Sequence, residues 1–175
     1  MARPRIIETV GSFRGHDGAR HTVDRGWEDD LAAELPELSR QPHILRSTPK
    51  DASRRFTDQE SADLWYDDEN KLPSVYTFRL GGLSVGGLVW MSSQQHVDTP
   101  GAHYTSGFRM YQGAVGRGLA RPFSEVAHED FFNLHPTSGI WLETDETNAA
   151  ALALYEKLGY TEIANHDGRV VMRLH

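Results

Sequence analysis

The sequence predicts an α/β domain with a mixed, twisted sheet of six or seven strands flanked by about four helices. From Val75 onward, short runs of β-branched and aromatic residues alternate with polar ones, which is typical of strands. Between two such runs, the apolar residues of segment 118–132 recur every three or four positions, as on an amphipathic helix. A helical crossover of this kind makes the two strands that it connects parallel. The length of 175 residues fits one ordinary domain.

The N-terminal part of the chain has the less regular pattern. Residues 1–18 are rich in glycine and arginine, and we interpret them as an arm or as an edge strand around Arg5 to Val10, followed by a single domain over residues 19–175. After a strand at 19–24, segment 27–38 predicts a helix, with a break at Pro36 as an alternative. Residues 42–49 begin and end with proline and predict an extended connection before a short helix at 58–66.

The C-terminal part alternates between strands and helices. Gly81 and Gly82 separate two strand-like runs, at 75–80 and 83–90, and suit a tight antiparallel hairpin. A polar loop then leads to a strand at 104–110, which precedes the helix of residues 118–132. The remaining expected elements are a strand at 139–144, a helix at 148–158 that ends at Gly159, and a hairpin of strands 160–164 and 169–174.

A loop with two glycines opens the helix of residues 118–132, and its sequence is Val115-Gly116-Arg117-Gly118-Leu119-Ala120. Glycines at 116 and 118 allow backbone N–H groups to turn toward one point, because no Cβ stands in the way. The start of the helix adds unpaired N–H groups and the positive end of its dipole. The loop is therefore a candidate phosphate-binding site, although a plain strand-to-helix turn explains the same residues.

A second motif further along the chain has several positions at fixed spacing, namely Asn148, Ala151, Leu154, Tyr155, Lys157 and Gly159. Together with the loop, it resembles the GCN5-related N-acetyltransferase (GNAT) family. The family's loop reads Gln/Arg-x-x-Gly-x-Gly/Ala, matched here at Gly118 and Ala120, while Val115 replaces Gln or Arg. Its later motif reads Asn-x-x-Ala-x-x-Leu-Tyr-x-Lys-x-Gly-Phe, and Tyr160 replaces Phe. The resemblance implies a GNAT-like sheet and acetyl-CoA as co-substrate.

The resemblance also implies roles for residues around a cleft between two parallel strands. Backbone groups of Phe108 and Met110 would bind the pantetheine arm, while core packing is the alternative for their side chains. Tyr155 would protonate the departing thiolate, and a phenol with an ordinary pKa of about 10 suits that role. The alternative for Tyr155 is a helix tyrosine that packs on the sheet with its hydroxyl in water.

Glu143 ends the strand before the second motif, and its position resembles that of the general base in ribosomal-protein N-terminal alanine acetyltransferases. Three interpretations stay open: a base that acts through water, an anchor for a cationic acceptor, and a solvent-exposed strand end. Asp145 and Glu146 are the fallback candidates for the base.

Asn148 either caps its helix or contacts the cofactor. The charges of Lys157 and Arg117 would neutralise the 3′-phosphate or the diphosphate of coenzyme A, and the alternative is that they are surface charges without a specific role. The complete predicted cofactor-binding set is Phe108, Met110, Val115, Gly116, Arg117, Gly118, Leu119, Ala120, Asn148 and Lys157.

The composition argues against several other classes. The chain has no cysteine, which excludes disulfides, a thiol nucleophile and cysteine-ligated zinc. His128-Glu129 lacks the second histidine of a zinc-protease motif, and the other histidines are scattered, so we expect no metal. The serines lack the Gly-x-Ser-x-Gly pattern of serine hydrolases. We expect no signal peptide, no membrane span and a cytoplasmic location.

The net charge of −7, from 25 acidic and 18 basic residues, argues against general nucleic-acid binding and favours a cationic acceptor. Acidic residues cluster at 28–30 and 58–69, either as solvated helix faces or as a rim that guides the substrate.

These observations predict an acetyl-CoA-dependent N-acetyltransferase that transfers acetyl directly to a primary amine of a small molecule or of a protein or peptide. The alternatives are a non-catalytic acyl-CoA sensor and an interaction module on the same fold. A homodimer is also open, because the apolar alternation of residues 169–175 fits strand pairing between copies as well as internal packing.

Overall fold

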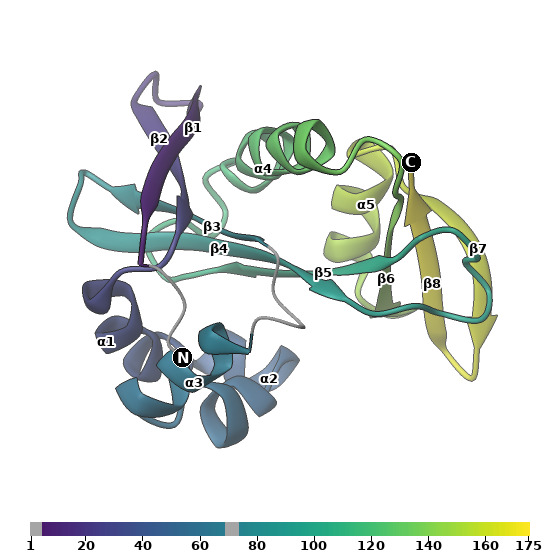
Figure 1. Ribbon diagram of the computed structural model, residues 1–175, viewed down its shortest axis with the longest axis horizontal. Helices are drawn as coiled ribbons and strands as arrows, with labels where there is room; N and C mark the ends of the chain where they lie inside the picture. Colours follow the sequence, from purple (N-terminus) through teal and green to yellow (C-terminus); the bar gives the residue numbers. More distant parts are fainter. Residues whose placement is uncertain (1–4, 69–73) are drawn as a thin grey trace.

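The structure is a computed structural model that describes residues 5–68 and 74–175. These residues form the strands β1 (Ile7–Arg14), β2 (Arg20–Gly26), β3 (Ser74–Leu80), β4 (Ser84–Ser93), β5 (Tyr104–Met110), β6 (Ile140–Asp145), β7 (Thr161–His166) and β8 (Arg169–Leu174). They build one sheet in the order β1-β2-β3-β4-β5-β6-β8-β7 (Figure 1). Neighbouring strands are antiparallel except β5 and β6, which are parallel. The predicted mixed sheet is confirmed, with eight strands instead of six or seven.

The N-terminal edge strand β1 accounts for the higher strand count. It pairs antiparallel with β2 from the Ile7–Gly26 pair to the Arg14–Arg20 pair. Of the two alternatives for the start of the chain, arm or edge strand, the structure has the edge strand, and this strand extends beyond the predicted end at Val10. Residues 1–4 lie outside the described part.

The described residues also form the helices α1 (Asp29–Leu38), α2 (Pro42–Ser47), α3 (Gln59–Asp67), α4 (Ala120–Leu134) and α5 (Ala149–Lys157), and a π-helical turn, η1 (Asp51–Arg55). Helix α1 continues past Pro36, so the break at this proline is absent. Arg40 and Ser39 both donate hydrogen bonds to the carbonyl oxygen of Pro36, which stabilises the end of the helix. Within these residues no helix is both long and apolar enough to cross a membrane.

Helix α2 overturns the prediction of an extended connection over residues 42–49. Pro42 occupies the first helical position, where the missing N–H costs no hydrogen bond. The carbonyl oxygen of Gln41 accepts the N–H of Leu45 at 3.0 Å, and Ile44 packs into the core with 2% of its surface exposed. The two prolines therefore bound a short helix, because tertiary packing outweighs the weak local preference for an extended chain.

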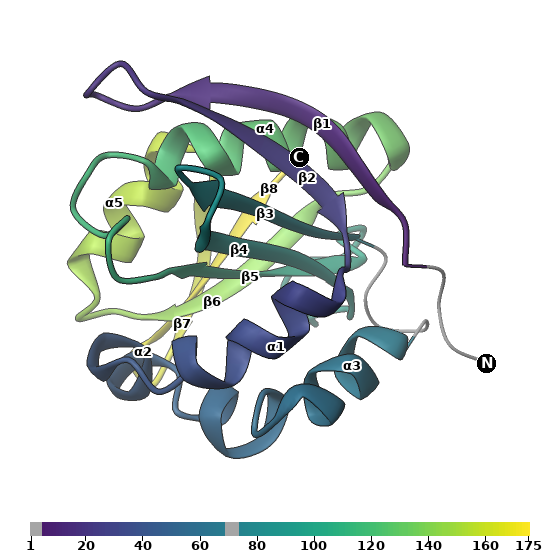
Figure 2. The same cartoon turned by 90° about the vertical axis from the view of Figure 1, so that its left-hand side faces the viewer.

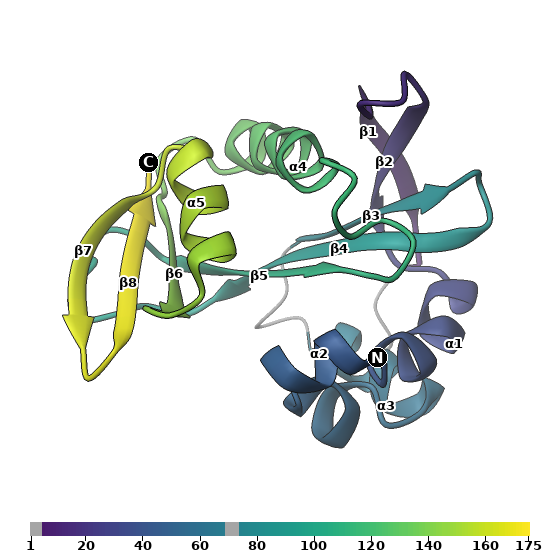
Figure 3. The same ribbon diagram turned by 180° about the vertical axis from the view of Figure 1, so that it is seen from behind.

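Helices cover both faces of the sheet in separate groups. Figure 1 and the reverse view in Figure 3 show α4 and α5 on one face and α1, α2 and α3 on the other. Alternate residues of β4 serve the two resulting cores: Val89 and Met91 pack with α4, whereas Leu88 and Trp90 pack with the α1–α3 group. Figure 2 shows β1 and β2 curving over α4. Strand β4 therefore contributes side chains to the hydrophobic cores on both faces of the sheet.

Candidate active site

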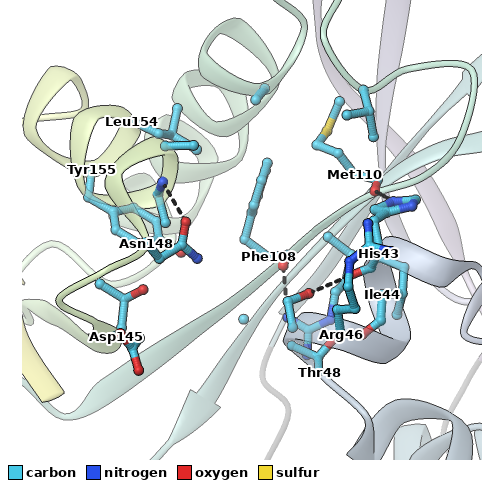
Figure 4. A pocket seen from close by; sticks show the side chains of 18 of the residues that line it. His43, Ile44, Arg46, Thr48, Phe108, Met110, Asp145, Asn148, Leu154 and Tyr155 are labelled. Atoms are coloured by element: carbon cyan, nitrogen blue, oxygen red, sulfur yellow. Dashed lines mark hydrogen bonds between the residues drawn. The ribbon is translucent and has the colours of Figure 1, made fainter. Parts of the chain in front are cut away.

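A cleft opens where the parallel strands β5 and β6 separate. They pair only at Tyr104–Ile140 and at Thr105–Trp141. Beyond these pairs, β5 remains paired with β4 and β6 remains paired with β8, so the inner edges of β5 and β6 diverge. The resulting cavity of about 740 Å³ is lined by β5, β6, α2, α5 and the glycine loop. In Figure 4, side chains of α5 form one wall and side chains of α2 form the opposite wall.

The cleft edge of β5 presents backbone groups of Phe108 and Met110. The N–H of Tyr111 donates to the carbonyl oxygen of Gly86 at 3.0 Å, which shows that this residue faces β4. Because backbone groups of successive strand residues point to opposite edges, Phe108 and Met110 point away from β4, into the cleft. Both residues also line the cavity (Figure 4). Two residues predicted from the sequence therefore lie at a strand edge that pairs with no other strand. Their carbonyl oxygens accept side-chain hydrogen bonds of 2.8 Å, that of Phe108 from Nη1 of Arg109 and that of Met110 from Nε2 of His43.

The glycine loop provides N–H groups without acceptors in the described protein. Ala114 and Val115 donate to the carbonyl oxygen of Tyr111, but no hydrogen bond within the described residues uses the N–H of Gly116, Gly118 or Leu119. Gly116 and Gly118 have φ values of +75° and +70°, which favour glycine. The free N–H groups lie directly before α4, and all four residues Gly116, Gly118, Leu119 and Ala120 line the cleft. Such an arrangement suits an anion.

The structure does not bring Arg117 or Lys157 to the cleft. The Arg117 guanidinium donates to Asp17 at 2.6 Å and to the carbonyl oxygen of Gly113 at 3.0 Å. It therefore ties the glycine loop to the tip of the β1–β2 hairpin, where the His16 ring also lies against Gly118. Lys157, in the last turn of α5, is exposed and is absent from the cavity lining.

Tyr155 lies on the α5 wall of the cleft, half-buried (Figure 4). Burial raises the pKa of this phenol above its usual value, and the positive charge of Arg109 opposes the increase. A raised pKa keeps the hydroxyl protonated at neutral pH. No hydrogen bond in the described structure uses this hydroxyl, so its proton is available to a bound molecule.

Asn148 caps α5, as one of its two predicted roles required. Its Oδ1 accepts the N–H of Ala151 at 3.2 Å. The side chain also lines the cleft (Figure 4), and its amide N–H groups remain free to donate. The second role, a contact with a bound molecule, is compatible with this position.

Glu143 is the candidate base that lies in the cleft without strong partners. Its carboxylate is 3.7 Å from Nε2 of His96 and 3.9 Å from Nη2 of Arg169, longer than hydrogen bonds. Asp145 also lines the cleft, but it accepts both the N–H and the hydroxyl of Thr147, and these hydrogen bonds lower its pKa. Such a carboxylate is a weaker base than one without these donors.

The fallback residue Glu146 lies away from the cavity lining and accepts a hydrogen bond from Asn165 at 2.9 Å. The acidic clusters near the N-terminus are also outside the cavity. Arg5 binds Asp63 at 2.8 Å, and Arg79 binds Glu28 at 2.8 Å. These acids form ion pairs between structural elements, while Glu69 lies outside the described residues. The overall negative charge therefore does not extend to the cleft, whose lining has both signs.

Residues 5–68 and 74–175 contain no group of three or more histidine and carboxylate side chains placed to hold a metal ion.

Comparison with known proteins identifies the family and the fold. The sequence pattern of the acetyltransferase (GNAT) domain matches residues 25–161. The chain belongs to the GNAT acetyltransferase family. No curated protein matches its sequence.

Solved GNAT structures share the fold at low sequence identity. The ribosomal-protein-S5-alanine acetyltransferase from Vibrio fischeri is 14% identical with a TM-score of 0.71, and the match covers 93% of this chain and 95% of that one. The acetyltransferase yncA from Salmonella typhimurium, solved with acetyl-CoA, is 17% identical with a TM-score of 0.66 over 89% and 93% of the two chains. An aminoglycoside acetyltransferase, AAC(6')-Ib, in complex with coenzyme A is 20% identical with a TM-score of 0.67 over 87% and 94%.

Two parts of the cleft of this GNAT protein were not predicted from its sequence. His43 and Arg46 line it from α2, which was expected to be extended. Pro42 was the available signal, because proline is favoured at the first position of a helix. Arg109 lines the cleft from β5 and binds both carboxylate oxygens of Asp51, 58 positions away in the sequence, so no local pattern indicates it.

Proposed function

We propose that this GNAT protein transfers an acetyl group from acetyl-CoA directly to a primary amine. One observation carries the proposal: the open edge of β5 and the free N–H groups of the glycine loop border the same cleft as the protonated Tyr155. A long substrate with amides and a diphosphate needs this combination. Its amides pair with a strand edge, and its phosphates accept backbone N–H groups before a helix.

Each group of the cleft has a role in this proposal. Backbone groups of Phe108 and Met110 bind the pantetheine arm, and the loop of residues 115–120 binds the diphosphate, with Asn148 as a further donor. Tyr155 donates its proton to the sulfur that leaves. Glu143 draws the acceptor's ammonium group into the cleft or takes its proton through water, and both roles follow from a carboxylate with loose partners.

Arg117 and Lys157 have lesser roles in the proposal. The contact of Arg117 with Asp17 supports holding the loop in place rather than direct neutralisation of phosphate. Lys157 is exposed at the end of α5, where it would meet only phosphate groups that extend beyond the cleft.

The acceptor is a primary amine on a small molecule or on a protein or peptide. The compared structures include a ribosomal-protein alanine acetyltransferase and an aminoglycoside acetyltransferase, so the shared fold is used with acceptors of both kinds. A cytoplasmic location and a homodimer through the C-terminal strands complete the proposal. Strand β7 is a sheet edge, which supports strand pairing between copies.

Two measurements test the function. Acetyl-CoA is expected to raise the melting temperature, because a ligand that binds only the folded protein stabilises it. Thiol release from acetyl-CoA is expected with at least one member of a panel of amines, and Tyr155→Phe is expected to lower it at least about tenfold. The Phe variant keeps the ring and removes only the hydroxyl.

The outcomes separate the alternatives. A melting temperature that does not respond to acetyl-CoA would leave an interaction module. A shift without turnover on any amine would leave an acyl-CoA sensor. Full turnover by Tyr155→Phe would remove Tyr155 from its role while the acetyltransferase function stands.

A further inference from the structure

The wall of the cleft that α2 forms carries a positive charge that the proposed function does not use. Arg46 lines the cavity, and Figure 4 shows it on the α2 side, across the cleft from the side chains of α5. Within the described residues, no hydrogen bond or ion pair uses its guanidinium group. The other two arginines of the cavity lining have carboxylates nearby: Arg109 binds Asp51, and Arg169 lies 3.9 Å from Glu143. Arg46 is therefore available to a negative group of a bound molecule.

Arg46 and Glu143 border the same half of the cleft. In β6, Ile140 and Leu142 belong to the core that α4 and α5 cover, so the alternation along the strand turns Glu143 toward the opposite face, where α2 lies. The glycine loop and Tyr155 belong to the side of α4 and α5. When acetyl-CoA binds as proposed, the half of the cleft between Glu143 and α2 therefore remains for the acceptor.

The chain segment that forms this wall is basic, although the whole protein is acidic. Residues 40–55 carry five basic side chains and one acidic side chain, in a chain with a net charge of −7. The acidic residue, Asp51, is buried and is bound by both Arg55 and Arg109. Arg40 donates its hydrogen bonds to backbone carbonyl oxygens, so it keeps its charge without a counter-charge in these contacts.

Three cations of this segment have no partner in the part of the chain that the structure describes: Arg46, Lys50 and Arg54. All three are exposed. Arg46 lines the cavity, whereas Lys50 and Arg54 lie outside its lining, and η1, which contains Arg54, packs against α2. These three side chains, the basic wall, extend the positive charge from the acceptor half of the cleft to the surface beside it.

Acidic helices limit the size of the basic wall. Helix α3 packs against η1 and α1 packs against α3, and their side chains Asp30, Glu37 and Glu60 are exposed, with no ion pair among the described residues. A nucleic acid places a phosphate at every nucleotide and binds to extended basic surfaces, so these acids would repel it. A peptide with a few acidic side chains needs only a short basic surface. The charge pattern therefore favours an acidic peptide over a nucleic acid.

We propose that the acceptor amine belongs to an acidic peptide segment, which the basic wall holds while the amine lies beside Glu143. This inference rests on the proposed acetyltransferase function and names the class of its acceptor. The acidic side chains nearest the amine meet Arg46, and those further along the peptide meet Lys50 and Arg54. Complementary charges of this kind give specificity and faster association more than high affinity.

The local charge, and not the net charge of −7, acts on a group at the basic wall. At physiological ionic strength the Debye length is about 8 Å, so charges on distant parts of the protein are largely screened. The amine itself is a cation and still meets the carboxylate of Glu143. One acceptor thus matches both signs of charge in its half of the cleft.

Peptides that differ only in charge test this inference without any change to the protein. Three peptides share their length and first residue and carry Asp and Glu, Asn and Gln, or Lys at the following positions. In thiol release from acetyl-CoA, kcat/KM for the acidic peptide is expected to exceed that for its isosteric amide counterpart by at least about fivefold, because several exposed ion pairs act together. The lysine peptide is expected to be the poorest, and added salt is expected to reduce the differences.

Charge reversals in the basic wall connect this preference with its residues. Arg46→Glu, Lys50→Glu and Arg54→Glu are each expected to lower kcat/KM for the acidic peptide about two- to fivefold, and the triple variant is expected to prefer the lysine peptide. KM for acetyl-CoA and the acetyl-CoA-induced melting shift are expected to stay unchanged, which also shows that the variants fold. Arg20→Glu is the matched control, because Arg20 is exposed, lies outside the cavity lining and has no partner among the described side chains.

The same variants distinguish a peptide from a small acidic amine. A small molecule inside the cavity reaches Arg46 alone, because Lys50 and Arg54 are outside the lining. An effect of Arg46→Glu without any effect of the other two reversals would therefore overturn the peptide and leave a small acceptor with a negative group. A single-stranded RNA that binds the wild type but not the triple variant, with no preference among the peptides, would overturn it in favour of a nucleic acid.

Failure of the function itself is distinguishable. A wild type that neither shifts with acetyl-CoA nor releases thiol with any amine removes the proposed function and this inference together. A wild type that acetylates the acidic, amide and lysine peptides equally well removes only the role of the basic wall.

Discussion

Thr105 on β5 and Trp141 on β6 form the last pair of the parallel ladder, and the two strands part immediately beyond them. Each strand is paired on its outer side, β5 with β4 and β6 with β8, so the inner edges stay open without loss of either strand. Trp141 is held by a hydrogen bond of 2.7 Å from its Nε1 to the carbonyl oxygen of Gln94. An extended ligand can pair with such an unpaired strand edge in the way that an additional strand would.

Gly118→Ala is expected to weaken binding of acetyl-CoA by about tenfold, which corresponds to about 1.4 kcal/mol. A Cβ at this position would lie 2.5 Å from Nε2 of His16, and the φ of +70° is unfavourable for alanine. The loop must move, and the free N–H groups move with it. Isothermal titration calorimetry with acetyl-CoA, in the absence of an acceptor amine, measures the change.

Gly81→Ala is the control, because its φ of +56° causes similar backbone strain while no atom lies within 4 Å of the added Cβ. It is expected to lower the melting temperature without changing the affinity. Equal affinities for all three proteins would contradict the role of the loop.

The ion pair between Asp17 and Arg117 gives a second test of the loop. Both side chains are about half exposed, so each single reversal, Asp17→Arg or Arg117→Asp, is expected to raise KM for acetyl-CoA only about two- to fivefold. The double reversal restores the pair and is expected to return KM to the wild-type value. Steady-state kinetics at low salt measures this, since added salt screens exposed pairs. Additive effects in the double variant would show that the contact does not hold the loop.

The sequence predicted the parts of the site whose geometry is set by neighbours along the chain. Positive φ at Gly118, the cap by Asn148 and the helical period before Tyr155 are local properties, and the structure has all three features. The contacts of Arg109 with Asp51 and of Arg117 with Asp17 join residues 58 and 100 positions apart. Such pairs depend on tertiary packing, which explains why Arg109 was missed and Arg117 was expected at phosphate instead.

Asp51→Ala is expected to lower the free energy of unfolding by about 3–5 kcal/mol, because it leaves a buried arginine without its partner. The Asp51 side chain is 1% exposed and that of Arg109 10%, with 2.5 Å between Oδ2 and Nε. Urea unfolding at neutral pH measures the change. Glu125→Ala removes the exposed pair with Arg121 and is expected to cost less than about 0.5 kcal/mol. Equal losses of unfolding free energy in the two variants would contradict a large contribution of the buried pair to stability.

The buried contact between Tyr160 and His128 affects how the stability of the protein changes in acid. The Tyr160 hydroxyl lies 3.0 Å from Nε2 of His128, and burial lowers the pKa of this histidine to about 4. In the neutral ring, either the hydroxyl donates to an unprotonated Nε2 or Nε2–H donates to the hydroxyl oxygen, according to the tautomer.

In the unfolded chain the same histidine has a pKa of about 6.5, so the unfolded state takes up the proton first as pH falls. Above pH 6.5 both states are neutral and the group contributes nothing. Between about pH 6.5 and 4 it lowers stability by about 1.4 kcal/mol per pH unit. His166 acts in the opposite direction, because Asp98 raises its pKa and the stabilisation is lost as pH rises.

His128→Gln isolates the buried group, since glutamine can accept from Tyr160 without titrating. Urea unfolding at several pH values between 6.5 and 4.5 is expected to show a flatter decline of stability for this variant than for the wild type. All other titrating groups are the same in both proteins, so the difference between the two curves reports His128 alone. Parallel curves would mean that the buried ring takes up a proton in the folded state as easily as in the unfolded chain.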